Sequence, residues 1–214
     1  MGCGPVTGRI IRSAACVAEG AAWLAAREPR IAQALERTGP LPLRLKPEGF
    51  AELLSAIMSQ QVSVASARAI QTRLQDAGLD DPVRVAKASA DDLRACGLSR
   101  QKITYAHALA HAGIDFDGLR ALPDAEVIKT LTAVSGIGPW TAEIYAMFSL
   151  GRADVFAHGD LALQEGARML FDLPTRPSEK DMRAMAVAWS PWRSVAARLL
   201  WAYYKLEKDR EGIS

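Results

Sequence analysis

The sequence LTAVSGIGPWTAEIYAMFSLGRADVFAHGDLAL, which runs from Leu131 to Leu163, decides how the rest of the chain is interpreted. Two glycines, Gly136 and Gly138, flank a single isoleucine, and Pro139 follows them. Glycine adopts backbone conformations that other residues resist, and proline suits the first position of a helix. The stretch therefore predicts a helix, a tight glycine turn and a second helix, whose N-terminal N–H groups form a phosphate-binding end.

Two further features accompany this hairpin. Asp160 lies twenty residues after Trp140, at the start of another expected helix, and the sequence WSPWRS occupies residues 189–194. Taken alone, Asp160 would be interpreted as a helix cap, and the nearby Asp154 as a turn residue. The role of Asp160 therefore has to be judged together with the hairpin and the WSPWRS segment.

SGIGPWTA at residues 135–142, the spacing to Asp160 and WSPWRS together resemble the helix–hairpin–helix superfamily of DNA glycosylases. Within it, the sequence is similar to the branch that removes alkylated bases, the bacterial DNA-3-methyladenine glycosylase II type. The resemblance covers about residues 45–207 and departs at Ser135, where the family usually has proline.

The resemblance implies an enzyme that binds damaged double-stranded DNA, flips a base out of the helix and hydrolyses its N-glycosidic bond. The expected bases are alkylated purines such as 3-methyladenine and 7-methylguanine. Asp160 matches the catalytic carboxylate, which stabilises positive charge on the sugar and can orient water. Trp140 stands where relatives that also cut the DNA backbone have a lysine, so a monofunctional enzyme without lyase activity is expected.

The expected base pocket contains two indoles. Trp140 and Trp201 match aromatic pocket positions of the family, and indole faces stack well on cationic, electron-poor bases. Ile144 and Leu161 are further expected pocket residues; they and Ala202 stand where tyrosine can occur, so the pocket is expected to be plainer and roomier. The alternative for Trp201 is ordinary core packing in the last helix.

The hairpin is expected to bind DNA phosphate through backbone N–H groups, without side-chain charge. These N–H groups belong to Gly136, Gly138 and Thr141. The resemblance also implies a structural Na⁺ or K⁺ held by the backbone carbonyls of Thr132, Val134 and Ile137. The alternative is a simple helix–helix turn with no ligand.

SQQVSVASA at residues 59–67 is a second patch that resembles the family. A flipped base leaves a hole in the duplex, which a side chain must fill. Gln61 matches this wedge position, and Gln60 is expected to contact DNA beside it. The alternative is a helix junction with two solvated glutamines.

Composition restricts the kind of DNA site. The chain has 214 residues, a formal net charge of +2 and a pI of about 8.5, so a nucleic-acid site must be a local patch. No run of apolar residues approaches the length of a membrane span, and no signal peptide is evident. A cytoplasmic monomer that does not associate with membranes is expected.

The cysteines and histidines give no pattern of a metal site. Cys3, Cys16 and Cys96 lie far apart, which excludes a four-cysteine iron–sulfur cluster. His107 and His111 are one helical turn apart, but no third ligand is near them in sequence. No catalytic cofactor or catalytic metal is expected.

The apolar residues recur at helical spacing, and no alternating strand pattern appears, so an all-α fold of roughly ten helices is predicted. Residues 1–13 are expected to be a loose leader, followed by a glycosylase-type domain over 14–214. One lobe is expected at about 62–170 and the other from about 14–61 plus 171–208. The resemblance implies an active-site cleft between these lobes.

Two alternatives remain open. The first is a glycosylase of the same fold that acts on deaminated or oxidised bases, which the altered pocket positions allow. The second is a non-enzymatic helix–hairpin–helix protein that binds DNA. Such a protein has no need for a carboxylate at the position of Asp160, so this residue discriminates between the two classes.

Overall fold

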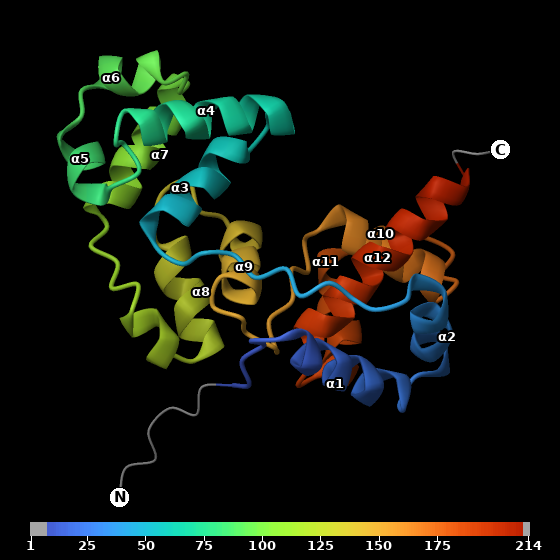
Figure 1. Ribbon diagram of the computed structural model, residues 1–214. Helices are drawn as coiled ribbons and strands as arrows, with labels where there is room; N and C mark the ends of the chain where they lie inside the picture. The colour runs from blue at the N-terminus through green and yellow to red at the C-terminus, as the bar shows by residue number, and fades with distance from the viewer. Residues whose placement is uncertain (1–7, 212–214) are drawn as a thin grey trace, which may run out of the picture. The chain divides into compact units, whose positions relative to one another are not determined.

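The computed structural model describes residues 8–211, and Figure 1 shows helices throughout that range. The described residues contain twelve α-helices, two short 3₁₀ helices and no strand beyond one isolated bridge between Ile10 and Arg152. The prediction of an all-α fold is confirmed. Among these helices, none combines the length and the apolar character needed to cross a membrane.

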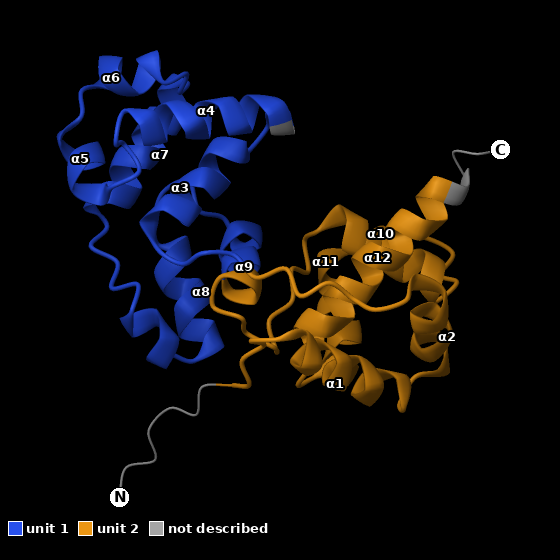
Figure 2. Cartoon of the chain, in the orientation of Figure 1, with its two compact units in different colours: residues 1–5, 46–145 blue, residues 6–45, 146–214 orange. Residues whose placement is uncertain are grey.

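The first compact unit comprises residues 46–145, coloured blue in Figure 2. Its helices are α3 (Phe50–Ser59), α4 (Val64–Asp76), α5 (Pro82–Lys87), α6 (Ala90–Ala95), α7 (Arg100–His111), η1 (Gly118–Ala121), α8 (Asp124–Thr132) and most of α9 (Pro139–Phe148). Its core includes the apolar face of α3, where Leu53 and Ile57 are fully buried, and α3 contacts α4 and α7.

The second compact unit comprises residues 8–45 together with 146–211 of the described chain, coloured orange in Figure 2. Its helices are α1 (Ala14–Ala25), α2 (Pro29–Thr38), α10 (Leu161–Leu170), α11 (Glu179–Met185), η2 (Ala186–Trp189) and α12 (Arg193–Glu211). Helix α12 contacts α1, α2 and α10. A Cβ at Gly166 would lie 2.6 Å from the carbonyl oxygen of Leu200, so glycine lets α10 approach α12 closely.

These boundaries differ from the expected lobe boundaries at about 62 and 170, which are therefore corrected to 46 and 145. Helix α3 belongs to the first unit because its buried face packs on α4 and α7. Helix α10 belongs to the second unit because it packs along α12. Helical periodicity predicts that a face is buried, but it does not say which helix covers that face.

The expected loose leader over residues 1–13 also requires correction for its second half. The N–H of Ile11 donates to the carbonyl of Gly151 (2.7 Å), and that of Ala153 donates to the carbonyl of Arg9 (3.0 Å). Ile11 is buried, and Ser13 caps α1 by accepting a hydrogen bond from the N–H of Cys16. Residues 8–13 are thus part of the second unit, whereas residues 1–7 lie outside the described residues.

Candidate functional site

The predicted hairpin is present between α8 and α9. Helix α8 ends at Thr132, and the turn that follows is closed by a hydrogen bond from Ile137 N–H to the carbonyl of Val134 (3.1 Å). Helix α9 begins at Pro139, and its first backbone hydrogen bond runs from Ala142 N–H to the carbonyl of Gly138 (3.1 Å). The opening turn of α9 thus has the backbone arrangement that binds anions at helix N-termini.

The two glycines of the hairpin serve different purposes. Gly136 has φ +95°, and a Cβ there would lie 2.4 Å from Cγ of Tyr105, so both its backbone and its surroundings require glycine. A Cβ at Gly138 would meet nothing within 4 Å. Gly136 therefore shapes the turn, whereas Gly138 leaves the surface beside the helix end open.

A hollow of about 710 Å³ in the first unit collects the predicted DNA-contacting residues. The hairpin supplies Gly136, Ile137, Gly138, Trp140 and Thr141, and the remaining lining residues are Ser59, Gln60, Gln61 and Tyr105. Trp140 has 44% of its surface exposed, which is unusual for so large an apolar side chain. The hairpin and the junction after α3, whose residues Gly136 and Gln60 are 76 apart in sequence, thus line one surface together with Tyr105.

The junction between α3 and α4 is attached to the hairpin. Gln60 Nε2 donates to the carbonyl of Gly136 (3.2 Å), and Lys102 Nζ donates to the carbonyl of Met58 at the end of α3. Burial lowers the pKa of Lys102. Gln61 has φ +56°, a left-handed conformation that costs energy for a residue other than glycine. The contacts of Gln60 and Met58 thus anchor the turn in which this exposed, strained glutamine lies.

Asp160 is the N-cap of α10 in the second unit. Its Oδ1 accepts hydrogen bonds from Ala162 N–H (2.9 Å) and Leu163 N–H (3.0 Å). Nε1–H of Trp201, which lies on α12, donates to the same oxygen at 3.2 Å. The backbone of the α10 N-terminus and the indole of Trp201 thus both donate to this one carboxylate oxygen. The side chain is half-buried and held in one orientation.

Trp201 packs against the buried ring of Phe148, which in turn contacts the buried Arg198. Its ring lies 5.7 Å from that of Phe148, and the Arg198 guanidinium lies 4.7 Å from the centre of the Phe148 ring on the same unit. Arg198 is 1% exposed, donates to the carbonyls of Leu43 and Ser194, and has a pKa lowered by burial to about 10. It therefore remains protonated at neutral pH.

The other predicted pocket residues are accessible but divided between the units. Leu161 is 61% exposed at the start of α10, and Ile144 is partly exposed on α9. Trp140 and Ile144 belong to the first unit, whereas Leu161 belongs to the second with Asp160 and Trp201. The structure thus joins Trp201 directly to Asp160, and the full composition of the base pocket stays a prediction.

Asp154, the other carboxylate considered from the sequence, contacts the WSPWRS segment. Its Oδ2 accepts hydrogen bonds from Ser190 Oγ (2.7 Å) and Arg193 Nη1 (3.2 Å). Trp189 and Trp192 in the same segment are buried. These contacts favour a structural role for Asp154 and for both tryptophans.

The three carbonyls of the predicted cation site lie in and before the hairpin turn. The Val134 carbonyl already accepts a hydrogen bond from Ile137 N–H, and a carbonyl oxygen has a second lone pair for a cation. Backbone carbonyls suit Na⁺ or K⁺, so the donor set fits such an ion. Within residues 8–211, no group of three or more His, Cys, Asp or Glu side chains is arranged to hold a metal ion.

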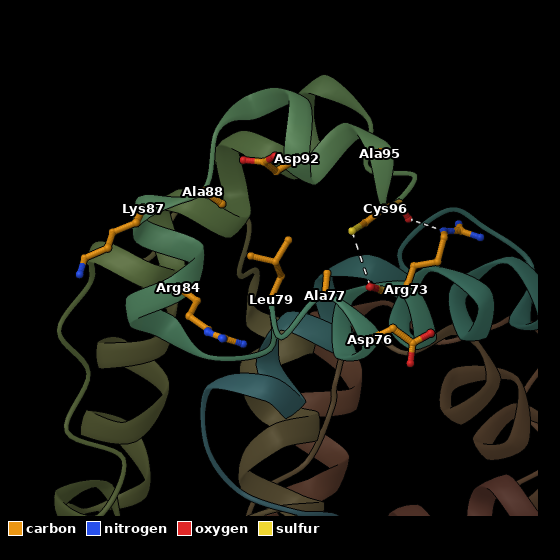
Figure 3. A pocket seen from close by; sticks show the side chains of 10 residues that line it. All are labelled: Arg73, Asp76, Ala77, Leu79, Arg84, Lys87, Ala88, Asp92, Ala95 and Cys96. Carbon is orange, nitrogen blue, oxygen red and sulfur yellow. Dashed lines mark hydrogen bonds between the residues drawn. The ribbon is translucent and has the colours of Figure 1, made fainter.

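A second hollow, of about 770 Å³, lies beside α4, α5 and α6 of the first unit (Figure 3). Arg73 Nε donates to the carbonyl of Cys96 (2.8 Å), and the Cys96 thiol donates to the carbonyl of Arg73 (3.7 Å), as the dashed lines show. Burial raises the pKa of Cys96. These reciprocal contacts connect α4 to the turn after α6, and none of the predicted site residues lines this hollow.

Four residues near the site were not predicted from the sequence. They are Lys102 and Tyr105 on α7, Phe148 on α9 and Arg198 on α12. Arg198 carried a signal, because it is a charged residue within the otherwise apolar run VAARLLW. The other three occupy ordinary positions of amphipathic helices, so only packing reveals them.

The hairpin, the carboxylate and the all-α fold together define a helix–hairpin–helix DNA repair protein, and comparison with known proteins agrees. Residues 54–192 match the HhH-GPD superfamily of base excision DNA repair proteins, and the chain belongs to this family. The resemblance stated from the sequence is thereby confirmed.

Individual relatives place the chain near the alkylated-base branch. DNA-3-methyladenine glycosylase 1 of Schizosaccharomyces pombe is 33% identical over 170 residues, which cover 75% of each protein. The solved 3-methyladenine DNA glycosylase of that yeast in complex with abasic DNA has a TM-score of 0.73 at 30% identity, covering 86% of this chain and 95% of that one. A DNA-3-methyladenine glycosidase from Bacillus halodurans has a TM-score of 0.80 at 36% identity, covering 87% and 89%.

Proposed function

We propose that this protein is a monofunctional DNA glycosylase that flips alkylated purines out of duplex DNA and hydrolyses their N-glycosidic bonds. 3-Methyladenine and 7-methylguanine are the proposed bases, and an abasic site is the product. Relatives that are at least 30% identical to this chain over most of their own length are named as 3-methyladenine glycosylases or glycosidases, which supports this substrate class.

The observation that carries the proposal is the arrangement of Asp160. The N-terminus of α10 and Nε1–H of Trp201 hold its carboxylate half-buried and oriented. Breaking the N-glycosidic bond of a cationic base develops positive charge on the sugar, and a preorganised carboxylate stabilises that charge. Asp160 is therefore the proposed catalytic residue, with water as the nucleophile.

Binding of the DNA is assigned to the first unit. The opening turn of α9, with the backbone N–H groups of Gly136, Gly138 and Thr141, is proposed to hold a backbone phosphate. Gln61, exposed and strained beside this turn, is proposed to fill the space that the flipped base leaves. A Na⁺ or K⁺ ion on the carbonyls of Thr132, Val134 and Ile137 would add positive charge near that phosphate.

The hairpin also bears on the type of reaction. Trp140 has no amine, so it cannot form a Schiff base with the sugar, and no backbone cleavage is expected. A sodium borohydride trap should therefore leave no covalent adduct between the protein and DNA. We further propose that the protein acts as a monomer in the cytoplasm.

The deciding experiment measures base release from methylated duplex DNA by the wild type and by Asp160→Asn. We expect the wild type to release methylated purines, and we expect Asp160→Asn to lose at least about 100-fold in rate while it still binds DNA. Asp172→Asn is the matched control, because Asp172 is an exposed carboxylate of the same unit. That variant should keep the wild-type rate.

Two results would contradict the proposal in different ways. Equal activity of the wild type and Asp160→Asn would mean that Asp160 is only a helix cap. No release of methylated purines by the wild type would mean that the substrate class is wrong. A panel of deaminated and oxidised bases would then distinguish another glycosylase from a protein that only binds DNA.

A further inference from the structure

The role of Trp201 extends beyond stacking on a base. A pocket residue that only stacks needs an exposed ring face, and its N–H direction is unimportant for that purpose. Here the indole Nε1–H points at Asp160 Oδ1 at 3.2 Å, across from α12 to the start of α10. The two side chains are 41 residues apart in sequence, so the tertiary structure has brought this donor to this carboxylate.

Three hydrogen bonds converge on Oδ1 of Asp160. Two come from the backbone of α10, and they would orient any capping side chain. The third comes from Trp201 and is not needed for capping. It restricts rotation of the carboxylate about its Cβ–Cγ bond, which fixes the direction that the second oxygen faces.

The indole is itself held in place by the residues packed behind it. Phe148 packs on the Trp201 ring, and Arg198 lies over Phe148 while donating to the carbonyls of Leu43 and Ser194. Phe148 and Arg198 are both buried, and all of these residues belong to the second unit. A ring supported in this way cannot turn without disturbing a close-packed core.

We propose that Trp201 is a positioning residue for catalysis, which sets the orientation of the Asp160 carboxylate through its indole N–H, with Phe148 and Arg198 as its support. This inference rests on the proposed glycosylase function, because it assigns a step of that reaction to Trp201. Preorganisation of a charged group before the transition state lowers the barrier more than binding strength alone does.

Trp201→Phe and Trp201→Ala separate this role from stacking. Phenylalanine keeps an aromatic face but removes the N–H, and alanine removes both. We expect Trp201→Phe to lower the single-turnover rate by about 10- to 100-fold, with DNA affinity within about twofold of the wild type. The loss should be the same factor for 3-methyladenine and 7-methylguanine, because the carboxylate acts on the sugar and not on the base.

Trp23→Phe is the matched control, because Trp23 lies on α1 of the same unit and stacks with Arg27 instead of contacting Asp160. It should keep the full rate. If Trp201→Phe is as active as the wild type and only Trp201→Ala is impaired, Trp201 merely stacks on the base and the inference is wrong. A loss in Trp201→Phe that differs strongly between the two bases would also overturn it.

The contact itself is tested without catalysis by the indole N–H signals in a ¹H–¹⁵N NMR spectrum. The signal missing in Trp201→Phe identifies Trp201, and we expect Asp160→Asn to shift that signal while the other indole signals stay in place. If it does not shift, the indole N–H does not bind Asp160 and the inference fails. A wild type that is inactive on every base while this shift is present would instead refute the proposed function.

Discussion

Asp160 is the N-cap of α10 and also the proposed catalytic carboxylate, two roles that the sequence presented as alternatives. As a cap, it satisfies two backbone N–H groups at the start of α10. As the proposed catalytic carboxylate, it is held in a fixed orientation by the same hydrogen bonds and by the indole N–H of Trp201. Capping thus supplies an orientation that the proposed catalytic role requires, so the two interpretations are compatible with one arrangement.

Stability measurements on two variants should separate these roles. Asparagine is about as good an N-cap as aspartate, whereas alanine cannot accept the capping hydrogen bonds. We expect Asp160→Ala to lower the free energy of unfolding by about 1–2 kcal/mol, and Asp160→Asn to lower it by less than about 0.5 kcal/mol. Urea denaturation of both variants tests this.

An equal loss of stability in the two variants would show that the charge of Asp160, and not its capping geometry, stabilises α10. The comparison also decides which variant suits the activity assay. If asparagine preserves the fold as expected, any loss of base release in Asp160→Asn reports on chemistry alone.

At the scale of an element, the hairpin between α8 and α9 shows why two neighbouring glycines differ. Gly136 combines a positive φ with the ring of Tyr105 on one side, so no side chain fits. Gly138 has neither constraint. The pattern G-I-G in the sequence conceals this division between a glycine required by the fold and a glycine that keeps a binding surface open.

Matched alanine substitutions should reveal that division. We expect Gly136→Ala to lower the free energy of unfolding by roughly 2 kcal/mol or more, because a Cβ would strain the backbone and overlap Tyr105. Gly138→Ala should change it by less than about 1 kcal/mol, since a lost cap preference and a stiffer unfolded chain oppose each other. Thermal unfolding tests the stabilities.

DNA binding by the same pair tests the proposed role of the surface. Gly138→Ala should bind duplex DNA several-fold more weakly although it is folded, because the added methyl group lies where the phosphate would approach. If folded Gly138→Ala protein binds DNA with unchanged affinity, this turn does not bind a DNA phosphate.

For the whole molecule, the sequence predicted elements better than their assembly. The all-α class and the hairpin follow from local periodicity, glycine and proline, which act over a few residues. The division into units does not, because α3 and α10 have similar apolar faces and only their partners assign them. The pairing of residues 9–11 with 151–153 was missed for the same reason.

The candidate site shows the same limit. Spacing and resemblance, which depend on residue order, are sufficient to propose site roles for Asp160, Gln60, Gln61 and the hairpin. The indole contact to Asp160, the strained φ of Gln61 and the support from Arg198 depend on side-chain directions in three dimensions. A sequence pattern specifies which groups are present, but not the direction in which each one points.

A partly buried hydrogen bond between the two ends of the first unit predicts how the stability of the protein depends on pH. Gly49 N–H donates to the phenol oxygen of Tyr145 (2.7 Å), and burial raises the pKa of Tyr145 to about 12 from an ordinary value of 10. In the unfolded chain the phenol ionises near pH 10, whereas in the folded protein it stays neutral. The stability that Tyr145 contributes is therefore complete below pH 10 and is lost as the pH rises to 12.

The matched variant is Tyr145→Phe, which does not titrate. We expect the wild type to lose roughly 2–3 kcal/mol more than Tyr145→Phe in free energy of unfolding between pH 10 and pH 12. Denaturant titrations at several pH values provide the comparison. Parallel curves for the two proteins would show that the phenol is as accessible to ionisation in the folded state as in the unfolded chain.

The order of the two units along the chain has a consequence for synthesis on the ribosome. The first unit is one continuous segment, so all of its helices leave the exit tunnel before α10 appears. Helices α1 and α2 emerge earlier still and can pack on each other, yet both also pack on α12, which follows α10 along the chain. The faces that α12 covers therefore stay exposed while about 150 further residues are translated, so we expect a chaperone that binds nascent chains to recognise them.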